Sequence, residues 1–249
     1  GLPMLLLHGV ADSWRSFERV LLHLPQSMHA IALTQRGHGD ADRPAAGYRT
    51  RDFAADADAL LDALDLGPAV VVGHSMGSTN ALRIAIDYPE RVLGLVIVGS
   101  FATYRGNPLI VEFWESTISQ LSDPIDPSMV REFQESTLAQ PVAKEFLDII
   151  IEESLKVPAR VWRASFEGVL EDDFAEELGQ INVPTLIVWG DQDAFCPRND
   201  QAALLSAITS SRLVVYEGAG HGLHWEKPER FADDLVAFGK GIATQTPIT

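Results

Sequence analysis

The chain is poor in cysteine and has no long apolar run. Cys196 is the only cysteine among 249 residues. This count excludes an internal disulfide and fits a reducing compartment, so we expect a cytoplasmic protein. No apolar run approaches the roughly 20 residues that a transmembrane helix needs. The apolar segment 1–7 has no basic region before it and leads directly into a motif, so it does not resemble a signal peptide.

Basic residues are also scarce. Nineteen Lys and Arg face 35 Asp and Glu, which gives a formal net charge of −16. Such a surface repels phosphate backbones and anionic lipid headgroups, so we expect neither nucleic acid nor membrane partners. The remaining composition, 46% hydrophobic and 22% charged, is that of a globular protein with one sizeable core. A small-molecule substrate is the only partner that the sequence suggests, and the oligomeric state is left open.

Short runs rich in Val, Ile and Leu alternate with amphipathic stretches in two parts of the chain. We predict strands at 2–7, 29–33, 69–72, 93–98, 185–189 and 213–216. We predict helices at 13–24, 52–64, 78–88, 200–207 and 228–238. Near-continuous apolar strands that alternate with helices predict an α/β fold, with a mostly parallel sheet covered on both faces.

The alternation stops between residues 103 and 178. This stretch has no convincing strand, and it is rich in aromatic and acidic residues. Prolines at 108, 124, 127, 141 and 158 divide it into short helices. We therefore predict a helical cap at 103–178, inserted into a core made of residues 1–102 and 179–249.

The most informative motif is Gly73-His74-Ser75-Met76-Gly77. It lies between a predicted strand and a predicted helix, which is the context of a nucleophile elbow, Gly-x-Ser-x-Gly. The glycines are needed because a tight turn brings neighbouring backbone close. The motif predicts that Ser75 is a nucleophile raised above the sheet, with a helix N-terminus behind it.

A serine nucleophile needs a base, which is usually a histidine. Of the seven histidines, His221 lies in the small-residue loop Gly218-Ala219-Gly220-His221-Gly222 directly after a predicted strand. Such a loop can hold an imidazole over the end of the sheet. His224 is the alternative, but it opens the last helix and more readily makes a local contact. We favour His221.

The histidine in turn needs a carboxylate that orients it. Gly190-Asp191-Gln192-Asp193 follows the predicted strand 185–189, at the edge where ligands of parallel sheets bind. Either aspartate can also shape the turn through its own hydrogen bonds. We favour Asp193 as the orienting acid and Asp191 as the turn former.

Two backbone N–H groups are expected to form an oxyanion hole. One belongs to Met76, the residue after the nucleophile. The other comes from the loop after the first strand, His8-Gly9-Val10, where we favour Val10.

These motifs resemble the α/β-hydrolase superfamily, in the branch that contains esterases, non-haem haloperoxidase-like enzymes, enol-lactonases and C–C hydrolases. The matching pieces are His8-Gly9, Arg36-Gly37-His38-Gly39, the segment around Ser75, Gly190-Asp191-Gln192-Asp193 and Gly220-His221, in the family order. The resemblance implies roles of nucleophile for Ser75, acid for Asp193 and base for His221, with oxyanion donors at Val10 and Met76. It also implies a cap where residues 103–178 lie.

The chain departs from the family at several points. Related chains usually begin with a hairpin before the His-Gly strand, which is missing here, so we expect either about two strands fewer than the eight of the family or a recombinant boundary. Many relatives carry Asp at the position of Thr34 and Ser at that of Asp40. Haloalkane dehalogenases share the fold but use an aspartate nucleophile, whereas this chain has Ser75 there.

Other chemistries are disfavoured. His221-x-x-His224 lacks the glutamate of a His-Glu-x-x-His metal motif, and position 42 is Asp where a dinucleotide fingerprint would place its third glycine. We therefore expect no metal and no cofactor. Five side chains are expected to line the substrate pocket: Trp14, Phe101, Trp114, Trp162 and Leu223.

The sequence thus predicts a serine hydrolase that cleaves small carboxylic esters or lactones through an acyl-enzyme. Hydrolysis of C–C bonds and peracid formation on the same triad are alternatives. C–C hydrolases of this kind generally have Asn before the nucleophile, and His74 in that place favours esters. A slow-turnover ligand receptor is a third alternative, for which the sequence offers no partner signal.

Overall fold

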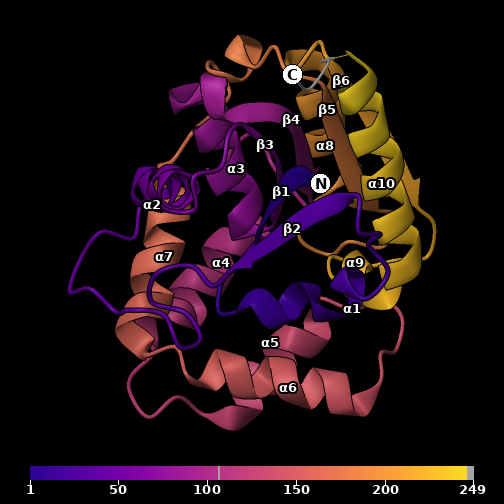
Figure 1. Cartoon of the computed structure of the whole chain (residues 1–249). Coiled ribbons are helices and arrows are strands. Elements are labelled where there is room, and N and C mark those ends of the chain that lie inside the picture. Colours follow the sequence, from indigo (N-terminus) through magenta and orange to yellow (C-terminus); the bar gives the residue numbers. More distant parts are fainter. Residues whose placement is uncertain (106, 246–249) are drawn as a thin grey trace.

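A sheet of six parallel strands forms the centre of the fold (Figure 1). The computed structural model describes residues 1–105 and 107–245. The strands are β1 (Leu2–Leu7), β2 (Met28–Leu33), β3 (Ala69–His74), β4 (Val92–Val98), β5 (Thr185–Gly190) and β6 (Ser211–Tyr216). All five strand pairs are parallel, in the order β2-β1-β3-β4-β5-β6. The predicted α/β fold with a mostly parallel sheet is confirmed.

The strand order reverses between β1 and β3. From β1 the chain passes to β2 on one side, and the later strands are added on the other side of β1. In open α/β sheets, ligands bind in the crevice outside the carboxyl ends of the strands at such a reversal. His8-Gly9 follows β1 and Ser75 follows β3, so this crevice is where the candidate site must lie.

Helices cover both faces of the sheet (Figure 1). The short α1 (Glu18–Leu21) and the long α10 (Pro228–Gln245) pack on one face, where Phe17, Leu235 and strand residues form a buried core. Helices α2 (Thr50–Ala63), α3 (Met76–Asp87) and α8 (Arg198–Ala207) cover the other face. Among the described residues, no helix combines the length and the apolar character needed to cross a membrane.

Two of the differences between predicted and observed helix bounds lie next to the loops that carry the candidate site. The segment predicted as one helix at 13–24 consists of the 3-10 helix η1 (Trp14–Phe17) followed by α1. Ser13 caps η1, because its side chain accepts a hydrogen bond from the Arg15 N–H. Helix α3 begins at Met76, directly after Ser75, so the strand-to-helix turn contains only one residue.

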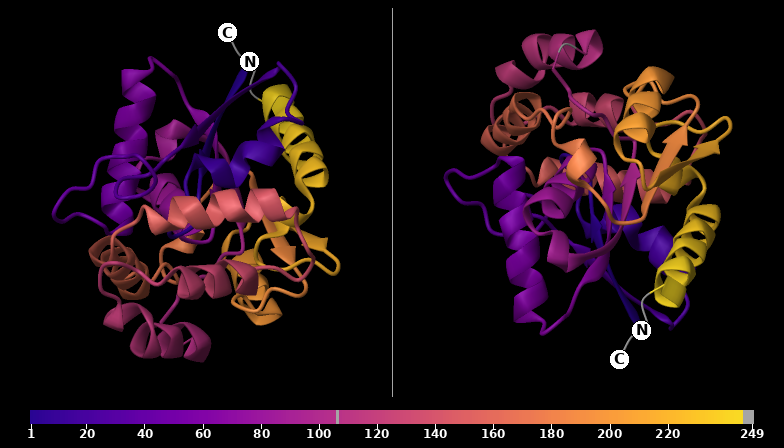
Figure 2. Two further views of the ribbon diagram at one scale, coloured as in Figure 1. Left: turned by 90° about the horizontal axis from the view of Figure 1, so that it is seen from below. Right: turned by 90° about the horizontal axis from the view of Figure 1, so that it is seen from above.

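Between β4 and β5 the described residues form helices and no further strand of the sheet. These are α4 (Pro108–Ser116), η3 (Ile118–Gln120), α5 (Pro127–Ser136), α6 (Lys144–Leu155), α7 (Ala159–Glu171) and η4 (Leu178–Gln180). Helices α4 and α5 each begin with a proline, preceded by a side chain that caps the helix (Asn107 and Asp126). Helices α4–α7 gather at the end of the sheet opposite the N-terminus (Figure 2).

The base of this insertion is closed by a single antiparallel bridge between Thr103 and Asp173. Phe174 and Leu178 lie beyond the bridge and pack in the core of the sheet. The helices that stand over the sheet therefore run from α4 to α7. The division into a cap at 103–178 and a two-part core stays a prediction.

Candidate active site

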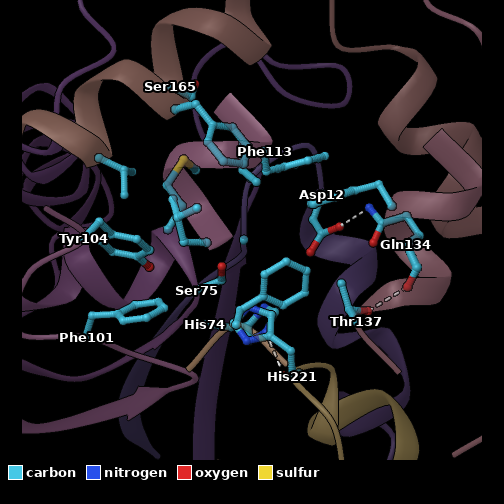
Figure 3. A pocket seen from close by; sticks show the side chains of 18 of the residues that line it. Asp12, His74, Ser75, Phe101, Tyr104, Phe113, Gln134, Thr137, Ser165 and His221 are labelled. Carbon is cyan, nitrogen blue, oxygen red and sulfur yellow. Dashed lines mark hydrogen bonds between the residues drawn. The ribbon is translucent and has the colours of Figure 1, made fainter. Parts of the chain in front are cut away.

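Ser75 occupies a strained turn between β3 and α3. Its backbone has φ 54° and ψ −121°, a conformation that non-glycine residues rarely adopt and that is concentrated at functional sites. The Ser75 N–H donates to the Val98 carbonyl at 3.0 Å, and the Ser75 carbonyl accepts from the Ser78 N–H at 2.8 Å. The turn is thus held from both sides, and the side chain projects into a cavity above the sheet (Figure 3).

The flanking glycines permit this turn. A Cβ atom on Gly73 would stand 2.0 Å from the Gly77 carbonyl oxygen, and one on Gly77 would stand 2.1 Å from the Leu7 carbonyl oxygen. Both distances are far below van der Waals contact with backbone atoms that cannot rotate away. Glycine is therefore the only residue that fits either position.

His221 and Asp193 form a buried pair at the ends of β6 and β5. The His221 Nδ1–H donates to Asp193 Oδ2 at 2.8 Å, which leaves Nε2 as the free basic nitrogen. Asp193 Oδ1 accepts from the N–H groups of Phe195 at 2.8 Å and Cys196 at 3.0 Å. Burial alone would raise the pKa of Asp193, but the charge and hydrogen bond of His221 and the two N–H groups hold it below its ordinary value. The carboxylate stays ionised and orients the imidazole.

The two alternatives from the sequence have other partners. Asp191 Oδ1 accepts from the Gly218 N–H at 2.7 Å, which ties the loop after β5 to the loop after β6. His224, in α9 (Leu223–Glu226), is fully buried, and its Nε2 lies 3.0 Å from Ser16 Oγ. The structure thus brings Asp193, and not Asp191, to His221.

The two predicted oxyanion donors line the same cavity as Ser75. Met76 is the first residue of α3, so its N–H has no partner within the helix. In the described ranges 1–105 and 107–245, neither Val10 nor Met76 donates its N–H to a backbone carbonyl. Both groups are therefore available to an oxygen bound beside Ser75.

The wall of the cavity is mainly apolar. Apart from the residues already described, it includes Phe101, Tyr104, Ile110, Phe113, Phe133, Phe166, Val169, Phe195 and Trp225. Asp12, His74, Gln134, Thr137 and Ser165 add polar groups, and no Lys or Arg is among the described residues that line it. Helices α4, α5 and α7 supply much of this wall, so the insertion closes over Ser75.

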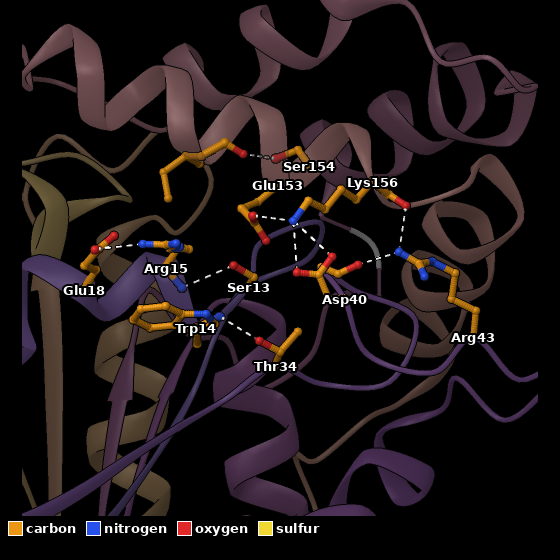
Figure 4. A network of polar contacts seen from close by, with 12 residues as sticks. Ser13, Trp14, Arg15, Glu18, Thr34, Asp40, Arg43, Glu153, Ser154 and Lys156 are labelled. Atoms are coloured by element: carbon orange, nitrogen blue, oxygen red, sulfur yellow. Dashed lines mark hydrogen bonds and ion pairs between the residues drawn. The ribbon is translucent and has the colours of Figure 1, made fainter.

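Only Phe101 of the five predicted pocket side chains lines this cavity. Trp14 lies outside the cavity and is 36% exposed. Its backbone N–H donates to Thr34 Oγ1, and the Arg15 guanidinium lies over its ring (Figure 4). Leu223 is fully buried in the core beneath α10. These placements follow from packing partners that are distant in sequence.

The two tryptophans of the insertion do not line the cavity either. Trp162 is fully buried between the cap helices, with its ring centroid 5.3 Å from that of Phe133. Trp114 packs against the same apolar cluster, while its neighbour Phe113 lines the cavity. One residue along a helix turns a side chain by about 100°, so sequence alone could not select between them.

Several polar residues of the cavity, among them Asp12, Tyr104 and Gln134, were not predicted from the sequence. Asp12 follows the oxyanion loop, Tyr104 lies beside Ser75 (Figure 3), and Gln134 comes from α5 in the cap. Burial raises the pKa of Tyr104 well above its ordinary value, so its hydroxyl stays a neutral donor. Of these residues, only Asp12 could have been placed near the site from the sequence, because it lies two residues beyond the predicted oxyanion donor Val10.

His74 supports the loop that carries His221. Its ring Nε2 lies 3.1 Å from the His221 carbonyl oxygen, to which it donates, so Nδ1 is the unprotonated nitrogen. Burial and the neighbouring His224 and His221 keep its pKa well below the ordinary value. His74 is therefore neutral and fixes the backbone beneath the proposed base.

The positions where the chain departs from its relatives make local contacts. Thr34 Oγ1 accepts a hydrogen bond from the Trp14 backbone N–H, and Asp40 pairs with Lys156 Nζ at 3.1 Å (Figure 4). Lys156 follows α6, so this exposed ion pair links the loop after β2 to the cap. Exposed pairs of this kind contribute about 0.2–1 kcal/mol.

Asp193, Cys196 and His221 also place three potential metal-ligand atoms within 4.8 Å of one another. The chemistry of the donor set does not suit a metal ion, however. His221 Nδ1 already donates to Asp193, and burial raises the pKa of the Cys196 thiol, while a metal requires the thiolate. The set acts as a hydrogen-bonded pair with a neutral thiol beside it.

A parallel α/β sheet with a strained serine after β3 and an Asp–His pair after β5 and β6 defines the α/β-hydrolase class of proteins. A sequence profile described as "Alpha/beta hydrolase family" matches residues 4–234, and the chain belongs to this family.

Similar proteins catalyse several reactions. The chain is 30% identical over 260 residues to a non-heme chloroperoxidase from Streptomyces lividans, covering 96% of this chain and 92% of that protein. It is 27% identical to a 2-hydroxy-6-oxononadienedioate/2-hydroxy-6-oxononatrienedioate hydrolase from Paraburkholderia xenovorans, covering 94% and 86%. An esterase structure from Exiguobacterium antarcticum superimposes with a TM-score of 0.87 at 26% identity, covering 96% and 92%. Membership in the family leaves the substrate open.

Proposed function

We propose that this protein is a serine hydrolase that cleaves small carboxylic esters or lactones through an acyl-enzyme on Ser75. The observation that supports it most is the 2.8 Å hydrogen bond from His221 to Asp193, formed on the wall of the cavity into which the strained Ser75 projects. Orientation of the imidazole by a buried carboxylate is what general-base activation of a serine requires.

The proposed reaction has two halves. His221 Nε2 takes the proton of the Ser75 hydroxyl as its oxygen attacks the carbonyl carbon, and the N–H groups of Val10 and Met76 bind the resulting oxyanion. His221 then protonates the leaving alcohol, or the ring oxygen of a lactone. In the second half His221 activates a water molecule, which releases the acid and restores Ser75.

The cavity favours esters and lactones over the C–C cleavage that the Paraburkholderia relative is named for. The named substrates of that relative are dioates, which carry two carboxylates. The described lining of this cavity contains Asp12 and no Lys or Arg. A second carboxylate would meet a like charge there without a compensating cation.

Peracid formation remains the second candidate, because the Streptomyces relative is named a chloroperoxidase. It requires the same acyl-enzyme, with hydrogen peroxide in place of water as the attacking group. Adding peroxide to an ester assay and measuring peracid separates the two fates of the acyl-enzyme.

A pre-steady-state assay with 4-nitrophenyl acetate tests the proposed nucleophile. We expect a burst of one nitrophenolate per protein molecule, and a mass increase of one acetyl group on the peptide that contains Ser75. Ser75→Ala abolishes both signals. Full turnover by Ser75→Ala would show that the mechanism is wrong.

A further inference from the structure

Asp12 is a carboxyl group inside the cavity for which the proposed mechanism has no use. It is 2% exposed and lies on the loop that carries the proposed oxyanion donor Val10. Its Oδ1 accepts from Gln134 Nε2 at 3.1 Å, and its Oδ2 accepts from Ser16 Oγ at 3.3 Å. Figure 3 shows the carboxyl and Gln134 at the side of the cavity across from Tyr104.

The carboxyl faces the reacting serine across the space left by a glycine. A Cβ atom on Gly9 would stand 3.3 Å from Asp12 Oδ2, 3.3 Å from Ser75 Cβ and 3.1 Å from His74 Nδ1. Asp12 is therefore within reach of a small molecule bound at Ser75. Its two hydrogen bonds use two of about four acceptor positions, so the carboxyl retains capacity for a ligand.

The contacts of Asp12 do not neutralise it. Gln134 and Ser16 are neutral donors, and neither Lys nor Arg is among the described residues of the cavity wall. Burial raises the pKa of Asp12 to about 7, although the hydrogen bonds from Gln134 and Ser16 and the charge of His221 act in the opposite direction. An unpaired buried carboxyl is costly, and such groups are concentrated at sites that bind or react.

We propose that Asp12, held by Gln134 of the cap, is a substrate-binding residue that pairs with a hydroxyl or ammonium group of the substrate and excludes substrates that carry a second, anionic group. The proposal rests on the proposed function for the identity of the site, and it adds the substrate class: uncharged or cationic esters and lactones with a hydrogen-bond donor. Asp12 thereby acts in specificity, while Ser75 and His221 perform the bond cleavage.

Three histidines and the side chain of Gln134 surround Asp12. His74 and His221 face it from the ends of β3 and β6, and His224 reaches it through Ser16. In the predicted cap, Gln134 Nε2 also donates to Ser154 Oγ at 2.9 Å. Beyond Ser154, Glu153 and Lys156 pair with each other at 2.8 Å.

Three matched probes test the charge preference by calorimetry: 2-phenylethylammonium, 2-phenylethanol and 2-phenylethanesulfonate. Their phenyl group suits the apolar wall, and their charges are constant between pH 5.5 and 8. At pH 8 we expect the ammonium to bind the wild type at least about tenfold more tightly than the sulfonate, with the alcohol between them. Asp12→Asn keeps the shape and removes the charge, so it reduces this ratio at least about fivefold.

Lowering the pH from 8 to 5.5 protonates Asp12 in the wild type, so the ammonium-to-sulfonate ratio should fall more steeply in the wild type than in Asp12→Asn, which keeps the neighbouring histidines. The comparison of the three probes with the wild type at pH 8 needs no variant, so it tests the proposal even where Asp12→Asn fails to fold. Asp191→Asn is the control, because it removes an exposed carboxylate from the same end of the sheet and leaves the ratio within about twofold of the wild type.

The binding assay needs no turnover, so it separates this proposal from the proposed function. A missing burst at Ser75 with an intact ammonium preference overturns only the esterase mechanism. An equal affinity for the three probes at pH 8, or a ratio that does not change in Asp12→Asn, overturns the role of Asp12. As a second readout, we expect kcat/KM to fall from methyl 3-hydroxypropanoate to monomethyl succinate in the wild type and to converge in Asp12→Asn.

Discussion

Gly73 and Gly77 approach each other so closely across the turn at Ser75 that a Cβ atom on Gly73 would stand 2.0 Å from the Gly77 carbonyl oxygen. The contact is between backbone atoms, so no side-chain rotation can relieve it. The backbone conformation of Ser75 depends on this approach, because the turn from β3 to α3 contains no other residue.

Gly73→Ala is therefore expected to destabilise the fold. Overpacking in a core usually costs about 1–3 kcal/mol, and contact with fixed backbone belongs at or above the upper end of that range. For a chain of this size, about 3 kcal/mol corresponds to a fall in Tm of roughly 6–12 °C in thermal unfolding. Gly67→Ala is the control, since nothing lies within 4 Å of a Cβ there. Equal Tm values for the two variants would contradict the steric argument.

Asp193→Asn should abolish most turnover while leaving the fold intact. The amide presents a donor where the carboxylate accepts the His221 Nδ1–H, so it favours the tautomer whose Nε2 is protonated and cannot act as a base. We expect kcat for 4-nitrophenyl acetate to fall by about 10³–10⁴-fold. Asp191→Asn, which weakens the bonds from the Gly218 N–H and the Gln192 amide, is the matched comparison and should keep at least about half of the wild-type kcat. A similar loss in both variants would argue against Asp193 as the orienting acid.

Trp162 should matter for stability and Trp14 should not. Trp162 is fully buried among the cap helices, and truncating a buried tryptophan to alanine costs about 3–5 kcal/mol. Trp14 is 36% exposed, so Trp14→Ala should cost less than about 1 kcal/mol. Urea unfolding followed by circular dichroism measures both values. The result would be contradicted if Trp14→Ala lowered the urea midpoint more than Trp162→Ala.

Four buried histidines predict a loss of stability in mild acid. Burial lowers the pKa of His38 to about 4 and that of His224 to about 3, and it holds those of His8 and His74 well below 6.5. As the pH falls below 6.5, the unfolded chain binds protons that the folded chain does not, so the free energy of unfolding falls. Each such proton contributes about 1.4 kcal/mol per pH unit.

Asp12 acts in the opposite direction over part of this range. Its folded pKa of about 7 exceeds its ordinary value of 3.8, so the folded chain holds this proton more tightly and loses that advantage as the pH rises towards 7. Because four histidines oppose one carboxyl, we expect the urea midpoint to decrease from pH 7 to pH 5. His38→Asn should reduce the change of the unfolding free energy with pH by the equivalent of about one bound proton. His23→Asn, which removes an exposed histidine, serves as control. A midpoint that is constant over this range would contradict the prediction.

The local pattern of the chain determined the sheet and the turn at Ser75. Apolar runs such as residues 69–72 predict buried strands, and their alternation with amphipathic helices predicts parallel connections. The glycines around Ser75 indicate a tight turn because no other residue fits one. These features depend on neighbours in the chain, so the sequence alone contains them.

Only the tertiary structure decided which side chains meet at Ser75. Two aspartates follow β5, and the loop path after β6 brings Asp193 to His221 and leaves Asp191 with Gly218. The contact of Asp12 with Gln134 joins residues 122 positions apart. The sequence predicted an inserted helical cap but could not orient its helices, because the face that a helix turns towards a cavity depends on packing against distant segments. That packing put Phe113 on the wall of the cavity and Trp114 beside it.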